Sequence, residues 1–127
     1  MANVDEIVLT IPRERPFYGV AHLVLGGLGS RLNLTYEDLE DLQLGLDSLL
    51  AQHGGEEVTL RIRILEGTIE TEIGPFPAAL SSELESDAGD GVGLRRILDT
   101  VADEVELDER DGGAWVTLTK NVDGVGR

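Results

Sequence analysis

A glycine-rich run, Gly89–Gly93, leads directly into Leu94–Val101, a segment whose apolar residues recur at helical spacing. Glycine lets a backbone approach a ligand closely, and the start of a helix presents unpaired N–H groups with a positive dipole end. That combination suits a phosphate group. The alternative is that the glycines form only a flexible turn, because short glycine motifs have low specificity. Gly91, Gly93 and Leu94 are therefore the first candidate ligand-binding residues.

Acidic side chains dominate the charge of the chain. Among 127 residues, 25 are Asp or Glu and 10 are Lys or Arg, for a net charge of −15. Such a surface repels phosphate backbones and anionic lipids, so we expect no nucleic-acid partner and no membrane partner. The charge suits a basic protein partner, although solubility or a salt-adapted source explains it equally well. Cysteine is absent, and the first residues lack the order of a signal peptide, so we expect a cytoplasmic protein.

The length and the 41% hydrophobic content predict a single domain over residues 1–120, followed by a disordered tail at 121–127. Apolar periodicity predicts helices over 17–32, 36–52 and 92–102, and strands over 7–11, 58–64, 69–73, 104–108 and 114–119. The order predicts an α+β fold, a two-layer sandwich of a mixed, mostly antiparallel sheet with about three helices on one face.

Local signals support several of these elements. Thr35 is a suitable N-cap for the second helix. In the central hairpin, Arg61 and Arg63 can face Glu70 and Glu72 across the strands, which accounts for their charges without catalysis. The stretch 75–91 lacks periodicity, and we expect a long connection of the kind that often forms lids or binding loops.

This order of elements resembles the GHKL ATPase fold, also called the Bergerat-type fold and shared with the ATPase domain of histidine kinases. Within that fold the chain is most similar to the small anti-sigma-factor serine kinases of bacterial partner-switching systems. Gly91–Val105 resembles the family's glycine-leucine phosphate loop and the helix after it, which ends in Asp-Glu-Val. Gly112–Lys120 resembles the family's final strand, which ends in lysine. Leu34–Leu44 resembles the start of the family's long ATP-site helix. The resemblance extends from Val4 to Lys120 and is most specific in the last third.

The resemblance also locates the catalytic positions, where this chain departs from the family. The family's long helix carries a glutamate general base and, four residues later, an asparagine that holds Mg²⁺; the matching residues here are Ser48 and Gln52. Serine at its ordinary pKa cannot act as a general base. Gln52 keeps an amide oxygen displaced by one methylene, which leaves it a weak candidate for the metal. Asp47 is a weak candidate for the base, although it lies about 100° further around the helix.

The adenine-reading aspartate of the family lies two residues before a glycine, at the end of the hairpin's second strand. Aligning that glycine with Gly74 puts Glu72 at the aspartate position, whereas the alternation of the strand puts Ile73 there. We favour Ile73, because a shift of one residue would turn every side chain to the opposite face. In both alignments the aspartate is missing. The nucleotide-binding candidates are then Gln52, Glu72, Gly74, Gly91, Gly93 and Leu94.

With three polar anchors altered, we expect a degenerate member that acts through protein contact. The resemblance implies a sigma factor or an anti-sigma antagonist as partner, a homodimer, and ATP with Mg²⁺ as the family's cofactor. One alternative is an active ATP-dependent serine kinase with Asp47 as base and Gln52 on Mg²⁺. Another is a site for a different small anion at Gly91–Leu94, assisted by Arg95 and Arg96. These arginines could instead form a solvated helix face that pairs with Asp99. We expect the two histidines, His22 and His53, to be structural.

Overall fold

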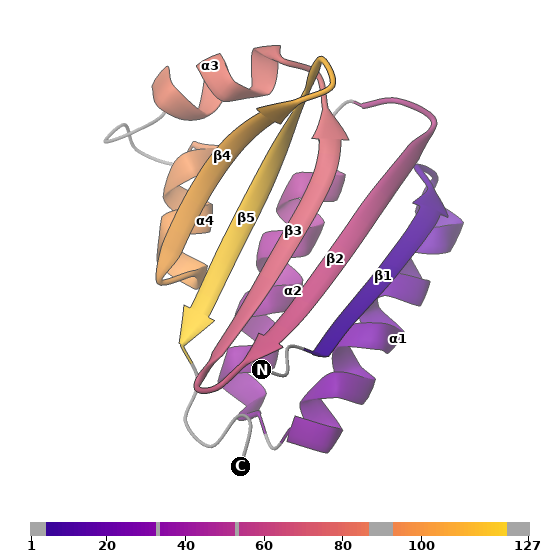
Figure 1. The fold of residues 1–127 in the computed structure, drawn as a ribbon, viewed down its shortest axis with the longest axis vertical. Coiled ribbons are helices and arrows are strands. Elements are labelled where there is room, and N and C mark those ends of the chain that lie inside the picture. The colour runs from indigo at the N-terminus through magenta and orange to yellow at the C-terminus, as the bar shows by residue number, and fades with distance from the viewer. Residues whose placement is uncertain (1–4, 33, 53, 87–92, 122–127) are drawn as a thin grey trace.

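The computed structural model describes residues 5–32, 34–52, 54–86 and 93–121, and shows an α+β sandwich (Figure 1). The five strands are β1 (Asp5–Pro12), β2 (Glu57–Leu65), β3 (Thr68–Phe76), β4 (Glu104–Arg110) and β5 (Gly113–Asn121). The helices are α1 (Arg15–Leu32), α2 (Tyr36–Leu50), α3 (Ala79–Ser86) and α4 (Leu94–Val101). The expected fold class is confirmed, and Asn121 lies in the last strand instead of the predicted tail.

The sheet has the strand order β1-β2-β3-β5-β4, and all four pairings are antiparallel. No parallel pair occurs between these strands, so the sheet is not mixed. In the register of the hairpin, Arg61 lies opposite Glu72 and Arg63 lies opposite Glu70, as the alternation predicted. The edges of the sheet are β1 and β4. Four of the seven residues of β4 are exposed acids: Glu104, Glu106, Asp108 and Glu109.

The core fills the space between one face of the sheet and α1, α2 and α4, while the opposite face carries no helix (Figure 1). Inward-facing strand residues such as Ile62, Ile73 and Val116 are fully buried against Leu46 and Leu49 of α2. Burial of this apolar surface is the main stabilising contribution.

Polar contacts fix the ends of the helices. The Thr35 hydroxyl accepts a hydrogen bond from the Asp38 backbone N–H at 3.0 Å, which confirms the predicted N-cap of α2. Lys120 Nζ donates to Asp41 Oδ2 at 2.9 Å and to the Val101 carbonyl at 3.2 Å. The end of β5 is thereby joined both to α2 and to the last turn of α4.

Helix α3 was not among the three predicted helices, and it corrects the expectation of a long irregular connection over 75–91. Leu80 and Leu84 lie one helical turn apart and are 4% and 0% exposed, so they attach α3 to the core. Two apolar side chains on an eight-residue helix are too few to produce a recognisable periodicity. Residues 87–92 of the predicted connection lie outside the described residues.

Replacing the buried anchor of α3 tests its attachment. Leu84→Ala should lower the free energy of unfolding by about 2–5 kcal/mol, because it leaves a cavity in a filled core. Urea denaturation measures the change. Ser82→Ala, on the exposed side of the same helix, is the control and should stay within about 0.5 kcal/mol of the parent. Equal effects of the two substitutions would contradict the packing described.

Candidate functional site

Three segments that carry the predicted site reach the same end of the domain. The C-terminal end of α2, the C-terminal end of β3 and the N-terminus of α4 all lie at the end of the sheet crossed by α3 (Figure 1). The elements are therefore arranged as the resemblance implies. Their side chains, however, point in different directions.

The amide of Gln52 is turned back on its own helix. Gln52 Nε2 donates to the Ser48 backbone carbonyl at 3.2 Å, and both side chains are half-buried. This bond uses one Nε2 hydrogen and holds the amide of the weak metal candidate against the end of α2. Ser48 supplies only a hydroxyl group, which does not titrate near neutral pH.

Asp47 faces α1. Its Oδ1 lies 2.6 Å from His22 Nε2, and the two side chains are about half exposed. This contact joins the two helices, and the structural role of His22 stays a prediction. The other histidine, His53, lies outside the described residues. Sequence reasoning missed this pair because the two residues are 25 positions apart and only the packing of α1 on α2 brings them together.

Glu72 and Ile73 lie on opposite faces of the sheet. Ile73 is fully buried beneath the helices, in agreement with the alternation of the strand. Glu72 lies on the helix-free face, where Oε1 accepts from Arg61 Nη1 at 2.9 Å and Oε2 lies 2.7 Å from Arg110 Nη2. Glu72 and Gln52 therefore do not converge on a common ligand position.

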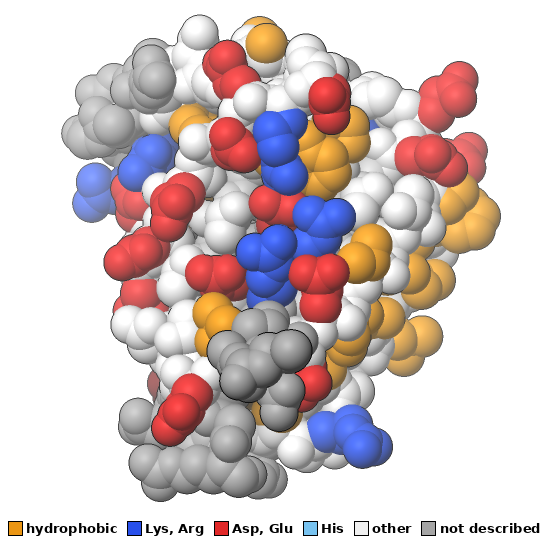
Figure 2. Space-filling model, viewed as in Figure 1, with side chains coloured by type: hydrophobic (Ala, Val, Ile, Leu, Met, Phe, Trp, Pro, Cys, Tyr) orange, Lys and Arg blue, Asp and Glu red, His pale blue; other side chains and the backbone are white. Residues whose placement is uncertain are grey.

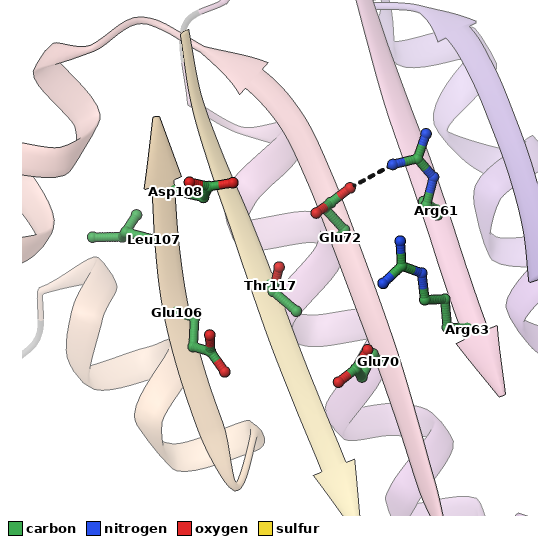
Figure 3. Close-up of a pocket in the computed structure, with 8 residues that line it drawn as sticks. All are labelled: Arg61, Arg63, Glu70, Glu72, Glu106, Leu107, Asp108 and Thr117. Atoms are coloured by element: carbon green, nitrogen blue, oxygen red, sulfur yellow. Dashed lines mark hydrogen bonds and ion pairs between the residues drawn. The ribbon is translucent and has the colours of Figure 1, made fainter. Parts of the chain in front are cut away.

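A pocket of about 340 Å³ opens on this helix-free face (Figure 3). Its side chains come from β2, β3, β4 and β5, and Arg61, Glu72 and Asp108 are among them. Both lining arginines are paired, Arg61 with Glu72 and Arg63 with Glu6. Arg110 pairs with Glu72 and Asp108 and lies over the Trp115 ring at 4.5 Å. We interpret this surface as the solvated face of the hairpin.

Gly74 is buried against the only tryptophan. A Cβ atom at this position would lie 2.6 and 2.7 Å from ring carbons of Trp115, closer than real Cβ contacts. Packing alone is therefore sufficient to require glycine here.

The start of α4 follows the predicted loop. Gly93 is the N-cap, in extended conformation and without a side-chain cap, and Leu94 begins the helix with 8% exposure. Gly91 lies outside the described residues. Arg95 Nε donates to both Asp99 carboxylate oxygens at 3.1 and 3.2 Å, which is the solvated-face pairing considered from the sequence.

The described residues contain neither a cluster of metal-ligating side chains nor a helix suited to cross a membrane. Within them, no three His, Cys, Asp or Glu side chains lie close enough together to hold a metal ion. Of their helices, none is both long enough and apolar enough to cross a membrane.

The glycine at position 74 gives a direct test of its packing role. Gly74→Ala should lower the free energy of unfolding by about 1–3 kcal/mol, because the methyl group must displace the indole ring. Trp115 fluorescence should shift together with the stability. Gly26→Ala, which points into open space on α1, should change stability by at most about 1 kcal/mol and leave the fluorescence unchanged. A neutral Gly74→Ala would refute the packing explanation.

Comparison with known proteins identifies relatives along the whole described fold. The serine-protein kinase RsbW of Bacillus velezensis is 27% identical over 146 aligned positions, which cover 96% of this chain and 89% of the relative. The RsbW of Listeria innocua is 28% identical, with 93% and 88% covered. No protein-family model matches the chain.

A solved structure shows the same fold. The crystal structure of the RsbU and RsbW domains of Rv1364c from Mycobacterium tuberculosis superposes with a TM-score of 0.66 at 11% identity. The match covers 93% of this chain and 32% of that longer chain. By sequence the chain is similar to the RsbW serine-protein kinases, and its fold is similar to that of a solved structure that includes an RsbW domain.

Proposed function

We propose that this chain is a regulatory protein that recognises a protein partner and has lost the ATP-dependent phosphorylation implied by the name of its relatives. The observation that carries the proposal is the divergence of the expected polar anchors. Gln52 donates to the Ser48 carbonyl, and Glu72 lies on the opposite face of the sheet with two arginines. Among the described residues, Ser48 and Ile73 stand where the resemblance puts the base and the adenine contact, and neither side chain carries a carboxylate.

The exposed face of α1 supports a protein-binding role. Phe17, Val20 and Leu23 are 39%, 39% and 77% exposed, although the helix is part of a folded domain. Figure 2 shows hydrophobic side chains gathered along the edge formed by β1 and α1. The 18 residues of α1 include no Asp or Glu, in a chain that has 25 of them. An apolar surface free of acids in a strongly acidic protein is typical of a contact site.

The resemblance to anti-sigma-factor kinases indicates which proteins to test. A sigma factor or an anti-sigma antagonist in the cytoplasm is the proposed partner, and a second copy of the chain can share the same face. Partner recognition needs the fold and its surface, whereas phosphorylation also needs the anchors that have changed. The proposal therefore separates partner recognition from the serine-protein kinase activity that the relatives' name gives.

Nucleotide titration tests the loss of the ATP site. Each buried anchor that is lost costs about 1–3 kcal/mol, so the absence of three should raise the Kd for Mg-ATP above the millimolar range. In calorimetry, Mg-ATP should release no more heat than Mg-tripolyphosphate, which lacks adenine. Asp47→Asn should behave as the parent does.

Two results would contradict this expectation. One is a micromolar Kd for Mg-ATP that tripolyphosphate does not share. The other is transfer of phosphate to serine in a partner protein, and its loss in Asp47→Asn would favour the active-kinase alternative with Asp47 as base.

A charge placed on α1 tests the contact face. Leu23→Asp should weaken binding to the partner by about tenfold or more, because a carboxylate must then be buried at the interface. Calorimetry against purified sigma factors and antagonists from the same organism measures the change. Leu44→Asp is the matched control, since Leu44 is 51% exposed on α2. Absence of binding to every candidate, or equal loss in both variants, would overturn the proposed role of α1.

A further inference from the structure

A cleft lies where the link between β1 and α1 meets the end of α2. It has a volume of about 540 Å³, and Arg13, Arg15, Tyr18 and Gln52 are among its lining residues. Gly54 and Gly55, just before β2, complete the wall. The cleft is separate from the N-terminus of α4, where the sequence placed its phosphate loop.

The two arginines of this cleft have no acidic partners among the described residues, a property they share with Arg31 and Arg96. Five basic side chains form ion pairs within the described part of the chain: Arg61, Arg63, Arg95, Arg110 and Lys120. Arg13 and Arg15 form none with the described acids, although acids outnumber bases more than twofold. The carboxylate that lines the cleft, Asp47, is already engaged by His22.

The guanidinium of Arg13 is fixed in place and incompletely satisfied. Its Nη2 donates to the Pro75 carbonyl at 2.8 Å, and its Cζ lies 5.0 Å from the centre of the Phe76 ring. Its Nε and Nη1 are buried without a hydrogen-bond partner. Burial lowers the pKa of Arg13, which is the expected response of a cation that lacks a compensating anion.

The surrounding backbone allows close approach to this charge. Gly54 lies directly against the guanidinium, since a Cβ there would come within 2.2 Å of Arg13 Cζ. Arg15 begins α1, so the positive end of that helix dipole adds to the two arginines. The Tyr18 hydroxyl donates to the Leu50 carbonyl at 3.3 Å and so occupies one acceptor at the negative end of α2.

We propose that this cleft binds a tetrahedral oxyanion, either inorganic phosphate or the phosphate of a monoester, through Arg15 and the Gly54–Gly55 backbone, with Arg13 as the fixed charge behind them. Guanidinium groups match phosphate oxygens in geometry as well as in charge. The site does not depend on the loss of the ATP site. The cleft also contains Asp47 and Gln52, which the resemblance offered for the base and the metal, but the proposed anion contacts are Arg15 and the Gly54–Gly55 backbone, to which the resemblance gives no role.

Backbone amide NMR distinguishes this site from the loop before α4. Inorganic phosphate and phenyl phosphate are titrated at constant ionic strength, with chloride as the balancing anion. Saturable shifts are expected at Gly54 and Gly55, with little change at Gly93. A stronger response to phenyl phosphate identifies the monoester as the better ligand, and equal responses identify the phosphate group alone.

Charge-neutralising variants complete the test. Arg15→Gln should weaken phosphate binding by about fivefold, since Arg15 is exposed and forms no ion pair with the described acids. Arg31→Gln, at the opposite end of α1, removes the same charge from the same helix and should leave binding unchanged. Non-saturating shifts, shifts centred on Gly93, or equal losses in the two variants would each overturn the proposal.

Discussion

The close approach of α2 to the sheet at Gly45 governs the rest of the molecule. A Cβ at Gly45 would lie 2.9 Å from Leu118 of β5 and 3.2 Å from Val101 of α4, so only glycine allows this contact without a shift. The contact fixes the rotation of α2 about its axis. Leu46 and Leu49 then face the core, and Asp47 necessarily faces α1. The side chains available at the candidate site follow from this packing.

Much of the fold could be predicted because its signals are local. Alternation and a two-residue turn determine how Arg61 faces Glu72, and a single hydroxyl determines where α2 begins. Helix α3 could not be predicted in the same way, because its stability comes from Leu80 and Leu84 entering a core made by distant segments. The antiparallel pairing of β1 with β2 and of β3 with β5 likewise depends on tertiary contacts, because no short turn joins these strands.

The places of the candidate residues in the fold were predictable, but their contacts were not. The parity of β3 correctly placed Ile73 inward, since alternation is a property of the strand itself. The pairing of Asp47 with His22, the contact of Gly74 with Trp115 and the isolation of Arg13 all join residues far apart in the chain. A glycine or a charge in a sequence does not reveal which distant atom occupies the space beside it.

The acids of β4 have a consequence for how molecules of this protein meet. An edge strand exposes unpaired backbone groups that can hydrogen-bond to another sheet. The four exposed carboxylates of β4 repel an approaching strand of the same kind, whereas the middle of β1 presents Val8, which is 52% exposed. The two edges are therefore protected unequally against aggregation. Edge-to-edge association of the sheets of two molecules would begin at β1, beside the apolar face of α1.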